Sequence, residues 1–344
     1  HVVREETLFA GIRAQIKSRD ELVSRIRVVT DACGNQVQGP LIHIIRFDTP
    51  VDGYDSEIGF PVASDINTGD VLTHTLRKMH FFSIFHRGPL ETLRGSTLQI
   101  FEHMNQTGLS SELELMEIYH HNDPENPDEN LIETRVSFLA WQEVYKEQLL
   151  RVLGPELTAE IWKDGEQITP FTLVNPRAEW VAESLQRLKT HTTPEQQFDI
   201  LSRVALIRPV EDILKYKKVY DETRDINKLL EILTANLNDS PIGGPIDPWY
   251  FENNVLHLSK VAANREAYDA AKTHQETRKA YCFCTLIREA TDPKVDPIFC
   301  YRAAGWARQF WEPILGTAFK QCTITHSILK GDRFCAWDTI VESA

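Results

Sequence analysis

The sequence predicts an α+β protein: a duplicated strand–helix–strand–strand domain, then a mostly helical domain with a small antiparallel sheet. Three observations lead to this prediction. Up to residue 141, segments with strand-like and helical spacing occur twice in the order strand, helix, strand, strand. Beyond residue 141, apolar residues recur mainly at helical spacing, and alternating segments return near the C-terminal end. The length of 344 residues also suggests two domains, since a domain averages roughly 150 residues.

The first copy of the repeat begins with a strand at residues 7–16. Ser18 is suited to cap the helix expected at residues 19–30, because its hydroxyl can accept a hydrogen bond from the first helical turn. Strands expected at residues 41–47 and 56–62 complete this copy.

The second copy begins with strands at residues 71–76 and 79–86. Pro89 then opens a helix, because its fixed φ suits the first helical position. Strands at residues 113–120 and 131–139 end this half of the chain. No clear sequence identity joins the two copies, so the duplication is predicted from the order of the elements alone.

The second half is predicted to be mostly helical. Helices are expected at residues 143–152, 178–188, 194–206, 209–220, 226–237, 265–278 and 303–315. Strands are expected at residues 280–288, 318–329 and 334–341, with a strand or helix start at 255–258. We therefore expect a domain at residues 1–141, a helical linker at 142–169 and a second domain at 170–344.

Charge and composition exclude several classes of protein. With 37 basic and 50 acidic residues the net charge is −13, which argues against a nucleic-acid-binding surface. Residues 1–141 hold 12 basic and 21 acidic residues, a net charge of −9 that favours neutral or cationic small molecules. No apolar run reaches the roughly 18 residues of a membrane span, and the N-terminus lacks a signal-peptide pattern. A cytoplasmic protein with reduced thiols and no membrane partner is expected, and a homo-oligomer is compatible with these features.

Glu117 is the first candidate site residue. Alternation along its strand places it beside Tyr119 on the more apolar of the two faces, where an unpaired carboxylate is costly to bury. Either Arg135 on the next strand pairs with it, or it serves as a ligand carboxylate or a general acid/base. In the second case Tyr119, Phe81 and Phe85 are expected to form aromatic walls around the ligand.

The first half of the chain resembles a known family. The features that carry the resemblance are Glu117-Ile118-Tyr119, then Asn122-Asp123-Pro124 and a final strand, and the strand end His86-Arg87-Gly88-Pro89. They look like gyrase-inhibitor-like domains, the effector-binding domains of AraC- and MerR-type regulators. The resemblance implies two repeated units with a ligand cleft on their pseudo-twofold axis, into which Glu117 reaches. Some members bind hydrophobic cations and others hydrolyse reactive small molecules. No helix-turn-helix precedes the domain here, so direct DNA binding is not expected.

The cysteines form the second candidate site, because five of the six lie in the last 63 residues. In a strand, Cys282 and Cys284 would face the same side and present two thiols to one ligand or metal. With Cys300 and Cys335 they supply four thiolates, the number that zinc or an iron–sulfur cluster requires, although no spacing matches a standard site. The alternatives are buried apolar cysteines, or a nucleophilic thiol at Cys282, Cys284 or Cys300.

Residues from about 170 to 341 resemble a less characterised family. The resemblance rests on Cys282-Phe283-Cys284, on Cys300 with Ala304-Gly305-Trp306, and on Gly331-Asp332-Arg333-Phe334-Cys335. These residues look like 4-vinyl-reductase-type small-molecule-binding domains and L-2-amino-thiazoline-4-carboxylate hydrolase-like proteins. Relatives often carry a second cysteine where this chain has Arg302, which weakens the four-thiolate interpretation. Trp306 is expected either to contact a ligand or to belong to a core-facing helix stripe.

Three hypotheses follow. The first is a cytoplasmic protein that binds a hydrophobic or cationic small molecule over Glu117 and has a second ligand module. The second is a hydrolase of a reactive or heterocyclic small molecule that uses Glu117 or a C-terminal cysteine. The third is a metal or redox module on the C-terminal cysteines; apart from this hypothesis no cofactor is expected.

Overall fold

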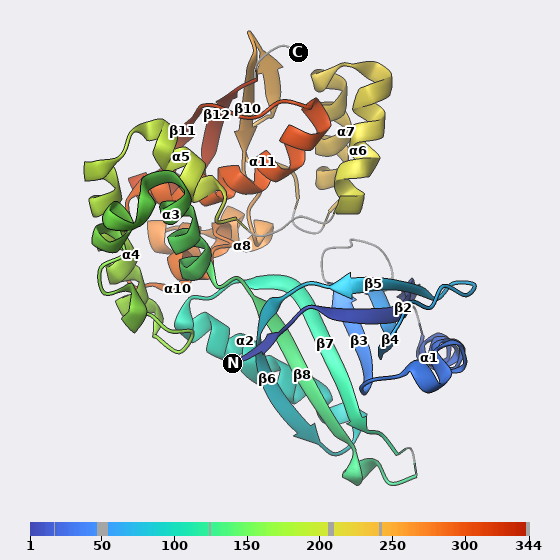
Figure 1. Ribbon diagram of the computed structural model, residues 1–344. Coiled ribbons are helices and arrows are strands. Elements are labelled where there is room, and N and C mark those ends of the chain that lie inside the picture. Colours follow the sequence, from blue (N-terminus) through green and yellow to red (C-terminus); the bar gives the residue numbers. More distant parts are fainter. Residues whose placement is uncertain (17, 47–53, 124, 206–209, 241–242, 342–344) are drawn as a thin grey trace. The chain divides into compact units, whose positions relative to one another are not determined.

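The computed structural model describes residues 1–344 except 17, 47–53, 124, 206–209, 241–242 and 342–344. The chain forms two compact units (Figure 1). The first comprises His1–Met104 and Ser111–Leu139, and the second comprises Asn105–Ser110 and Ala140–Ala344. Both units combine helices with antiparallel strands, so the predicted α+β class is confirmed.

The first unit is built on an eight-stranded antiparallel sheet in the order β1-β6-β8-β7-β3-β4-β2-β5. Its strands are β1 Val2–Arg4, β2 Thr7–Ile16, β3 Leu41–Arg46, β4 Tyr54–Pro61, β5 Leu72–Leu76, β6 Met79–Arg87, β7 Ser111–His121 and β8 Leu131–Phe138. Each strand predicted in this half is present, although the end of the 41–47 strand lies outside the described residues. The short strand β1 was not predicted.

One helix follows the first strand of each repeat in this unit. Helix α1 spans Arg19–Cys33, and the Ser18 hydroxyl accepts a hydrogen bond from the Glu21 amide, as its predicted capping role requires. Helix α2 spans Leu93–Thr107 after a short 3₁₀ turn at Leu90–Thr92, so the helix starts later than Pro89. The predicted order of strand, helix, strand, strand therefore holds in both copies.

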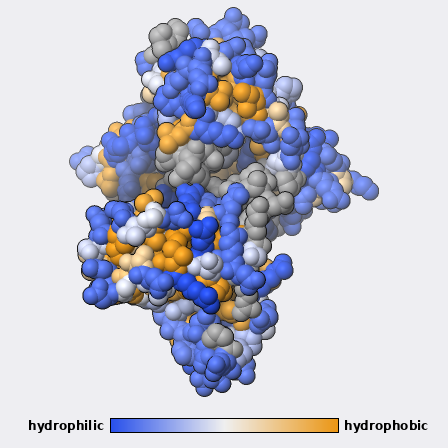
Figure 2. All heavy atoms as spheres, turned by 90° about the vertical axis from the view of Figure 1, so that its right-hand side faces the viewer, coloured by the Kyte–Doolittle hydropathy of each residue, from blue (hydrophilic) through white to orange (hydrophobic). Residues whose placement is uncertain are grey.

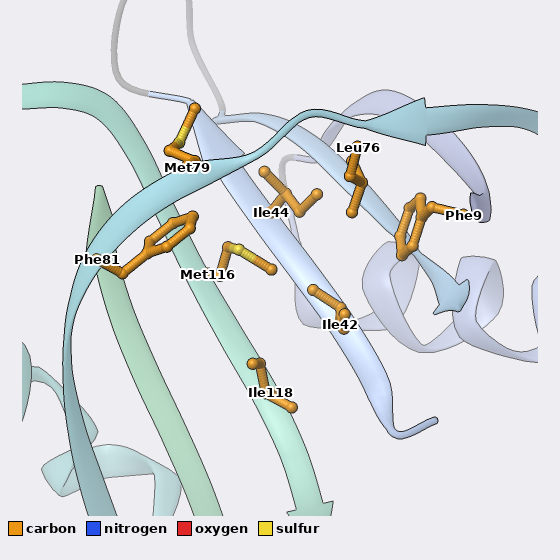
Figure 3. Packing of buried hydrophobic residues seen from close by; sticks show 8 residues of the cluster. All are labelled: Phe9, Ile42, Ile44, Leu76, Met79, Phe81, Met116 and Ile118. Atoms are coloured by element: carbon orange, nitrogen blue, oxygen red, sulfur yellow. The ribbon is translucent and has the colours of Figure 1, made fainter. Parts of the chain in front are cut away.

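Both faces of the central strands are buried. On one face Met116 and Ile118 of β7 pack with Ile42, Phe9 and Phe81 in a cluster enclosed by the curled ends of the sheet (Figure 3). On the other face, α1 covers apolar side chains of β2 and β4. The row with Met116 and Ile118 is thus buried as well as the row with Leu115 and Glu117, because the sheet curls over it.

The second unit is mostly helical. Its helices are α3 Trp141–Ile161, α4 Val174–His191, α5 Pro194–Ser202, α6 Val210–Thr223, α7 Ile226–Asn238, α8 Arg265–Ala270, α9 His274–Tyr281, α10 Thr285–Glu289 and α11 Tyr301–Leu315. Gly154 has a positive φ of 77° inside α3, so the helix expected to end there kinks and continues. This helix fills much of the segment expected as a linker.

A four-stranded sheet in the order β11-β12-β10-β9 completes the second unit. Its strands are β9 Tyr250–Glu252, β10 Val255–Ser259, β11 Cys322–His326 and β12 Ala336–Ile340. The prediction of a strand at residues 280–288 was wrong. A capping box between Thr273 and Glu276 starts helix α9, which ends at Tyr281. Helix α10 begins at Thr285, after three intervening residues. Cys282 and Cys284 lie in the short connection and not in a sheet.

The segment Asn105–Ser110 belongs to the second unit although the first unit flanks it in sequence. The Ser110 hydroxyl lies 3.1 Å from the Thr285 hydroxyl, and the Arg288 guanidinium donates to the Asn105 side chain at 2.9 Å. Gly108 has a positive φ of 66°, and a Cβ there would lie 3.0 Å from the Leu286 backbone. Glycine is therefore required both by the backbone conformation and by the close approach.

The visible surface in Figure 2 is mostly hydrophilic and carries a few patches of hydrophobic residues. Single exposed apolar side chains are ordinary on protein surfaces. Within the described ranges, no helix combines the length and the apolar character needed to cross a bilayer.

Candidate functional sites at Glu117 and the cysteine cluster

The strand register places Glu117 on the helix-covered face of the first unit. Glu117 of β7 lies opposite His43 of β3 on one side and Thr134 of β8 on the other. His43 in turn lies opposite Ile58, which packs under α1. Cross-strand partners share a face, so Glu117, His43 and Thr134 all lie on the face that carries α1.

Helix α2 covers the other end of the same face. Phe82 of β6 packs edge-on against His103 of α2, with ring centroids 4.7 Å apart, and the His86 ring lies 3.1 Å from the Ser96 hydroxyl of α2. Phe82 lies opposite Val136, which lies opposite Leu115, two residues before Glu117. Glu117 therefore stands on the sheet between the strands that α1 and α2 cover.

Two side chains hold the Glu117 carboxylate. Tyr119 donates its hydroxyl hydrogen to Oε2 at 2.7 Å, and His43 Nδ1 lies 3.3 Å from the same oxygen. His43 Nε2 lies 3.1 Å from the Ser56 hydroxyl. With the neutral imidazole protonated at Nδ1, every one of these bonds has a donor: Ser56 donates to His43, and His43 donates to Glu117.

The carboxylate stays ionised and has one oxygen to spare. Burial opposes ionisation, but the hydrogen bond and electrostatic attraction of His43, together with the hydrogen bond from Tyr119, outweigh it and hold the pKa of Glu117 below its ordinary value. The side chain is 17% exposed, and among the described residues both of its hydrogen-bond partners contact Oε2. Oε1 is therefore available to a ligand.

Ser56, His43 and Glu117 are connected like the members of a serine–histidine–acid triad. A triad serine must present its Oγ to a substrate carbonyl, whereas Ser56 is only 1% exposed. The Ser56 hydroxyl is therefore placed to orient His43 rather than to attack a substrate.

Arg135 is not the partner of Glu117, which corrects one of the two predicted alternatives. Arg135 lies opposite Met116, on the face away from Glu117, and it forms two short ion pairs with Glu133 at 2.7 and 3.0 Å. His120 also contacts Glu133, at 3.1 Å. The buried carboxylate of Glu133, which the sequence did not single out, is thus fully compensated and is a structural group.

The predicted aromatic walls are placed differently. Phe81 is buried in the cluster on the opposite face of the sheet, and Phe85, also on that face, is 60% exposed beside His120. Tyr119 does lie beside Glu117. Strand β6 does contribute to the Glu117 face, but through Phe82 and Ile84 instead of Phe81 and Phe85.

The buried hydroxyl of Thr134 is a further polar group on this face, and sequence reasoning missed it. Thr134 lies directly opposite Glu117, its side chain is fully buried, and its Oγ1 has no hydrogen-bond partner among the described residues. A buried hydroxyl without a partner is unfavourable by roughly 1–3 kcal/mol.

The cysteine-rich segments bring Cys300 and Cys335 together in the second unit. Cys300 lies 3.3 Å from the Ser327 hydroxyl. Interaction with the neighbouring Cys335 thiol, together with burial, raises the pKa of Cys300. The same interaction lowers the pKa of Cys335 against the opposing effect of burial, and the nearby Lys260 ammonium lowers it further. Cys335, predicted only as a metal ligand, is thus the thiol best stabilised as a thiolate.

The four cysteines predicted as metal ligands do not form a ligand set. Among the residues that the structure describes, no group of three or more His, Cys, Asp or Glu side chains is arranged to hold a metal ion. Burial raises the pKa of Cys282 to about 12. The residues present therefore do not fit zinc or an iron–sulfur cluster.

Cys284 and Trp306 are the two remaining predicted site residues of the second unit. Arg302 donates to the Cys284 sulfur at 3.6 Å. On α11, Phe310 and Trp311 are buried and Trp306 is 43% exposed, so two of the three aromatics of the expected helix stripe pack in the core.

No protein-family model and no curated protein matches the chain. Among solved structures, an EcmrR–DNA complex matches 40% of this chain and 55% of that chain, at 14% identity and a TM-score of 0.36. SAV2435 bound to tetraphenylphosphonium matches 41% of this chain and 95% of that chain, at 10% identity and a TM-score of 0.30. A hydrolase from Listeria innocua matches 40% of this chain and 89% of that chain, at 13% identity and a TM-score of 0.32.

Proposed function

We propose that the first unit binds a small hydrophobic cation through the carboxylate of Glu117. The observation that carries this proposal is an ionised, largely buried carboxylate whose second oxygen accepts no hydrogen bond from the described residues. An ionised carboxylate in such surroundings gains from a cationic partner, because charges interact more strongly where water is excluded.

The surroundings of Glu117 support a ligand with apolar parts. The same face carries Phe82 and Ile84, and the Tyr119 ring lies beside the carboxylate. Aromatic faces attract cations as well as apolar groups. The net charge of −9 over residues 1–141 adds a long-range attraction for cations.

Binding of tetraphenylphosphonium to the full chain, measured by isothermal titration calorimetry, tests the proposal. Glu117→Gln keeps an acceptor for Tyr119 and removes the charge. It should weaken binding at least about tenfold, which corresponds to roughly 1.4 kcal/mol. Glu129→Gln is the matched control, because it removes one exposed carboxylate from the same unit.

Neutral triphenylphosphine oxide separates charge from shape. It should bind more weakly than the cation to the natural protein, and Glu117→Gln should affect it little. Equal loss of tetraphenylphosphonium affinity in Glu117→Gln and Glu129→Gln would show that the loss results only from the change in net charge. Unchanged affinity in Glu117→Gln would contradict a site at this residue.

A second candidate function is hydrolysis of a reactive small molecule with Glu117 as general base. The lowered pKa of Glu117 favours this role over that of a general acid, because the group is deprotonated near neutral pH. Turnover of strained-ring or thiazoline substrates that is lost in Glu117→Gln would support it. Retained cation binding without turnover across such a panel would favour binding alone.

A further inference from the structure

Cys300 and Cys335 are neighbours in the second unit although they are far apart in sequence. Cys300 ends the 3₁₀ turn Pro297–Cys300, immediately before α11, and this turn packs against β11 and the 3₁₀ turn Ile328–Lys330. Cys335 immediately precedes β12. The two thiols interact with each other, and neither is part of a disulfide. The fold therefore brings two reduced sulfur atoms together.

Hydrogen bonds fix the chain around this pair. The Cys335 amide donates to the Tyr281 hydroxyl at 2.7 Å, and that hydroxyl donates to the Cys335 carbonyl at 3.2 Å. The same carbonyl accepts a hydrogen bond from the Lys260 amide at 3.0 Å. Ser327 is fully buried, and its hydroxyl lies 3.3 Å from the Cys300 sulfur. Both cysteines are thus held in place, which favours a reaction between them.

A positive charge lies near the pair. The Lys260 ammonium lies 4.9 Å from the centre of the Phe283 ring and 5.9 Å from that of the Tyr281 ring. The Cys300 thiol and this ammonium lower the pKa of Cys335 to about 7, although burial opposes the change. The pKa of Cys300 is raised. Near neutral pH the pair therefore combines a thiolate at Cys335 with a thiol at Cys300.

The surroundings of the pair favour a small reactant. Cys335 is only 5% exposed, and Cys300 is partly buried. Burial shields a thiolate from bulky electrophiles, whereas a small neutral peroxide resembles water in size and polarity. The thiolate is the form of cysteine that peroxide oxidises to a sulfenic acid, and an adjacent thiol converts the sulfenic acid to a disulfide.

We propose that Cys335 and Cys300 form a dithiol site for small peroxides, in which Cys335 attacks the peroxide and Cys300 resolves the product. The Cys335 thiolate attacks one oxygen of hydrogen peroxide, the O–O bond breaks, and a sulfenic acid and hydroxide form. The Cys300 sulfur then attacks the sulfenic sulfur, the S–O bond breaks, and the Cys300 proton leaves with the hydroxyl group as water. Hydroxide takes up the proton that Cys335 released on ionisation. The two thiols are oxidised to one disulfide, and hydrogen peroxide is reduced to two water molecules.

Peptide mapping of the full natural chain tests the site. The reduced protein is treated with a small molar excess of hydrogen peroxide, blocked with N-ethylmaleimide and digested. Trypsin places Cys300 in the peptide 295–302 and Cys335 in the peptide that begins at residue 334, apart from every other cysteine. We expect the loss of two of the six thiols and a cross-link between these two peptides that dithiothreitol removes. Retention of all six thiols, or a disulfide that involves another cysteine, would overturn the proposal.

Variants separate the roles of the two thiols. In Cys300→Ala, peroxide should oxidise Cys335 more slowly and add oxygen to it without forming a disulfide, as fragmentation of its peptide in the mass spectrometer would show. In Cys335→Ala, Cys300 should remain a thiol. Cys322→Ala is the matched control, because burial raises the pKa of that thiol to about 12, and the cross-link should form at an unchanged rate. Oxidation of Cys300 that is as fast in Cys335→Ala as in the natural chain would overturn the assigned roles.

Discussion

Replacing Tyr119 with phenylalanine should raise the pKa of Glu117 measurably. The variant removes one hydroxyl hydrogen bond of 2.7 Å to Oε2 and leaves the ring in place. A hydrogen bond to a charged group contributes roughly 1.5–3 kcal/mol, and one pKa unit corresponds to about 1.4 kcal/mol. The pKa of Glu117 in Tyr119→Phe should therefore lie above that of the natural protein.

The sign of the linked change in stability follows from the direction of the shift. The pKa of folded Glu117 lies below its ordinary value of 4.5, so this group stabilises the fold above that pH. The contribution disappears as the pH falls through the folded pKa. Tyr119→Phe should therefore cost the most stability near neutral pH, and progressively less as the pH falls through the folded pKa of Glu117.

Carbon-13 NMR of selectively labelled glutamate side chains measures this pKa directly. The Glu117 signal is identified by its absence from Glu117→Gln, and Tyr250→Phe in the second unit serves as a control for tyrosine substitution. A pKa that is unchanged in Tyr119→Phe would refute the conclusion that this hydroxyl stabilises the carboxylate. A loss of stability that is equal at neutral and acidic pH would show that the hydroxyl acts through packing alone.

Four further outcomes can be tested. Gly59→Ala should destabilise the first unit at the upper end of the roughly 1–3 kcal/mol cost of overpacking, because a Cβ would lie 2.1 Å from the Ala10 carbonyl oxygen. Gly95→Ala in helix α2 should stabilise the first unit by about 0.5–1 kcal/mol, because the added Cβ meets no other atom. Urea unfolding in which both glycine variants changed the free energy of unfolding in the same direction would contradict this. Thr193→Ala should cost about 1 kcal/mol in urea unfolding, since it removes the capping box of α5, whereas an unchanged midpoint would show that the cap is dispensable. Tetraphenylphosphonium affinity should fall as the pH drops through the lowered pKa of Glu117 and the carboxylate gains a proton, and calorimetry at several pH values would show no such fall if another residue held the cation.

The sequence predicted local structure well where caps and alternation are strong. Ser18 marks the start of α1, and alternation identified β7 and β8 together with the face shared by Glu117 and Tyr119. The failure at residues 280–288 arose because a short apolar run was interpreted without the Thr273–Glu276 capping box, a signal present in the sequence.

Partners across the sheet were harder to predict, because they depend on register. Arg135 is close to Glu117 in the order of strands, yet it points to the other face because it lies opposite Met116. His43 is 74 residues from Glu117 in sequence, and only the pairing of β3 with β7 brings the two together. Arg302 beside Cys284 and two aromatic rings likewise results from packing between helices, which spacing alone does not specify.

The segment Asn105–Ser110 has a consequence for any attempt to study the units apart. The chain crosses from one unit to the other three times, so neither unit is a single continuous fragment of the sequence. A fragment that starts at Ala140 would lack Gly108 and Ser110. Its Leu286 would lose the close contact with Gly108, and the Thr285 amide would lose the Ser110 hydroxyl to which it donates a hydrogen bond. A fragment that ends at Leu139 would carry those residues without their surroundings. Folding of the second unit is thus tied to synthesis of the first, and excised halves are poor surrogates for the intact chain.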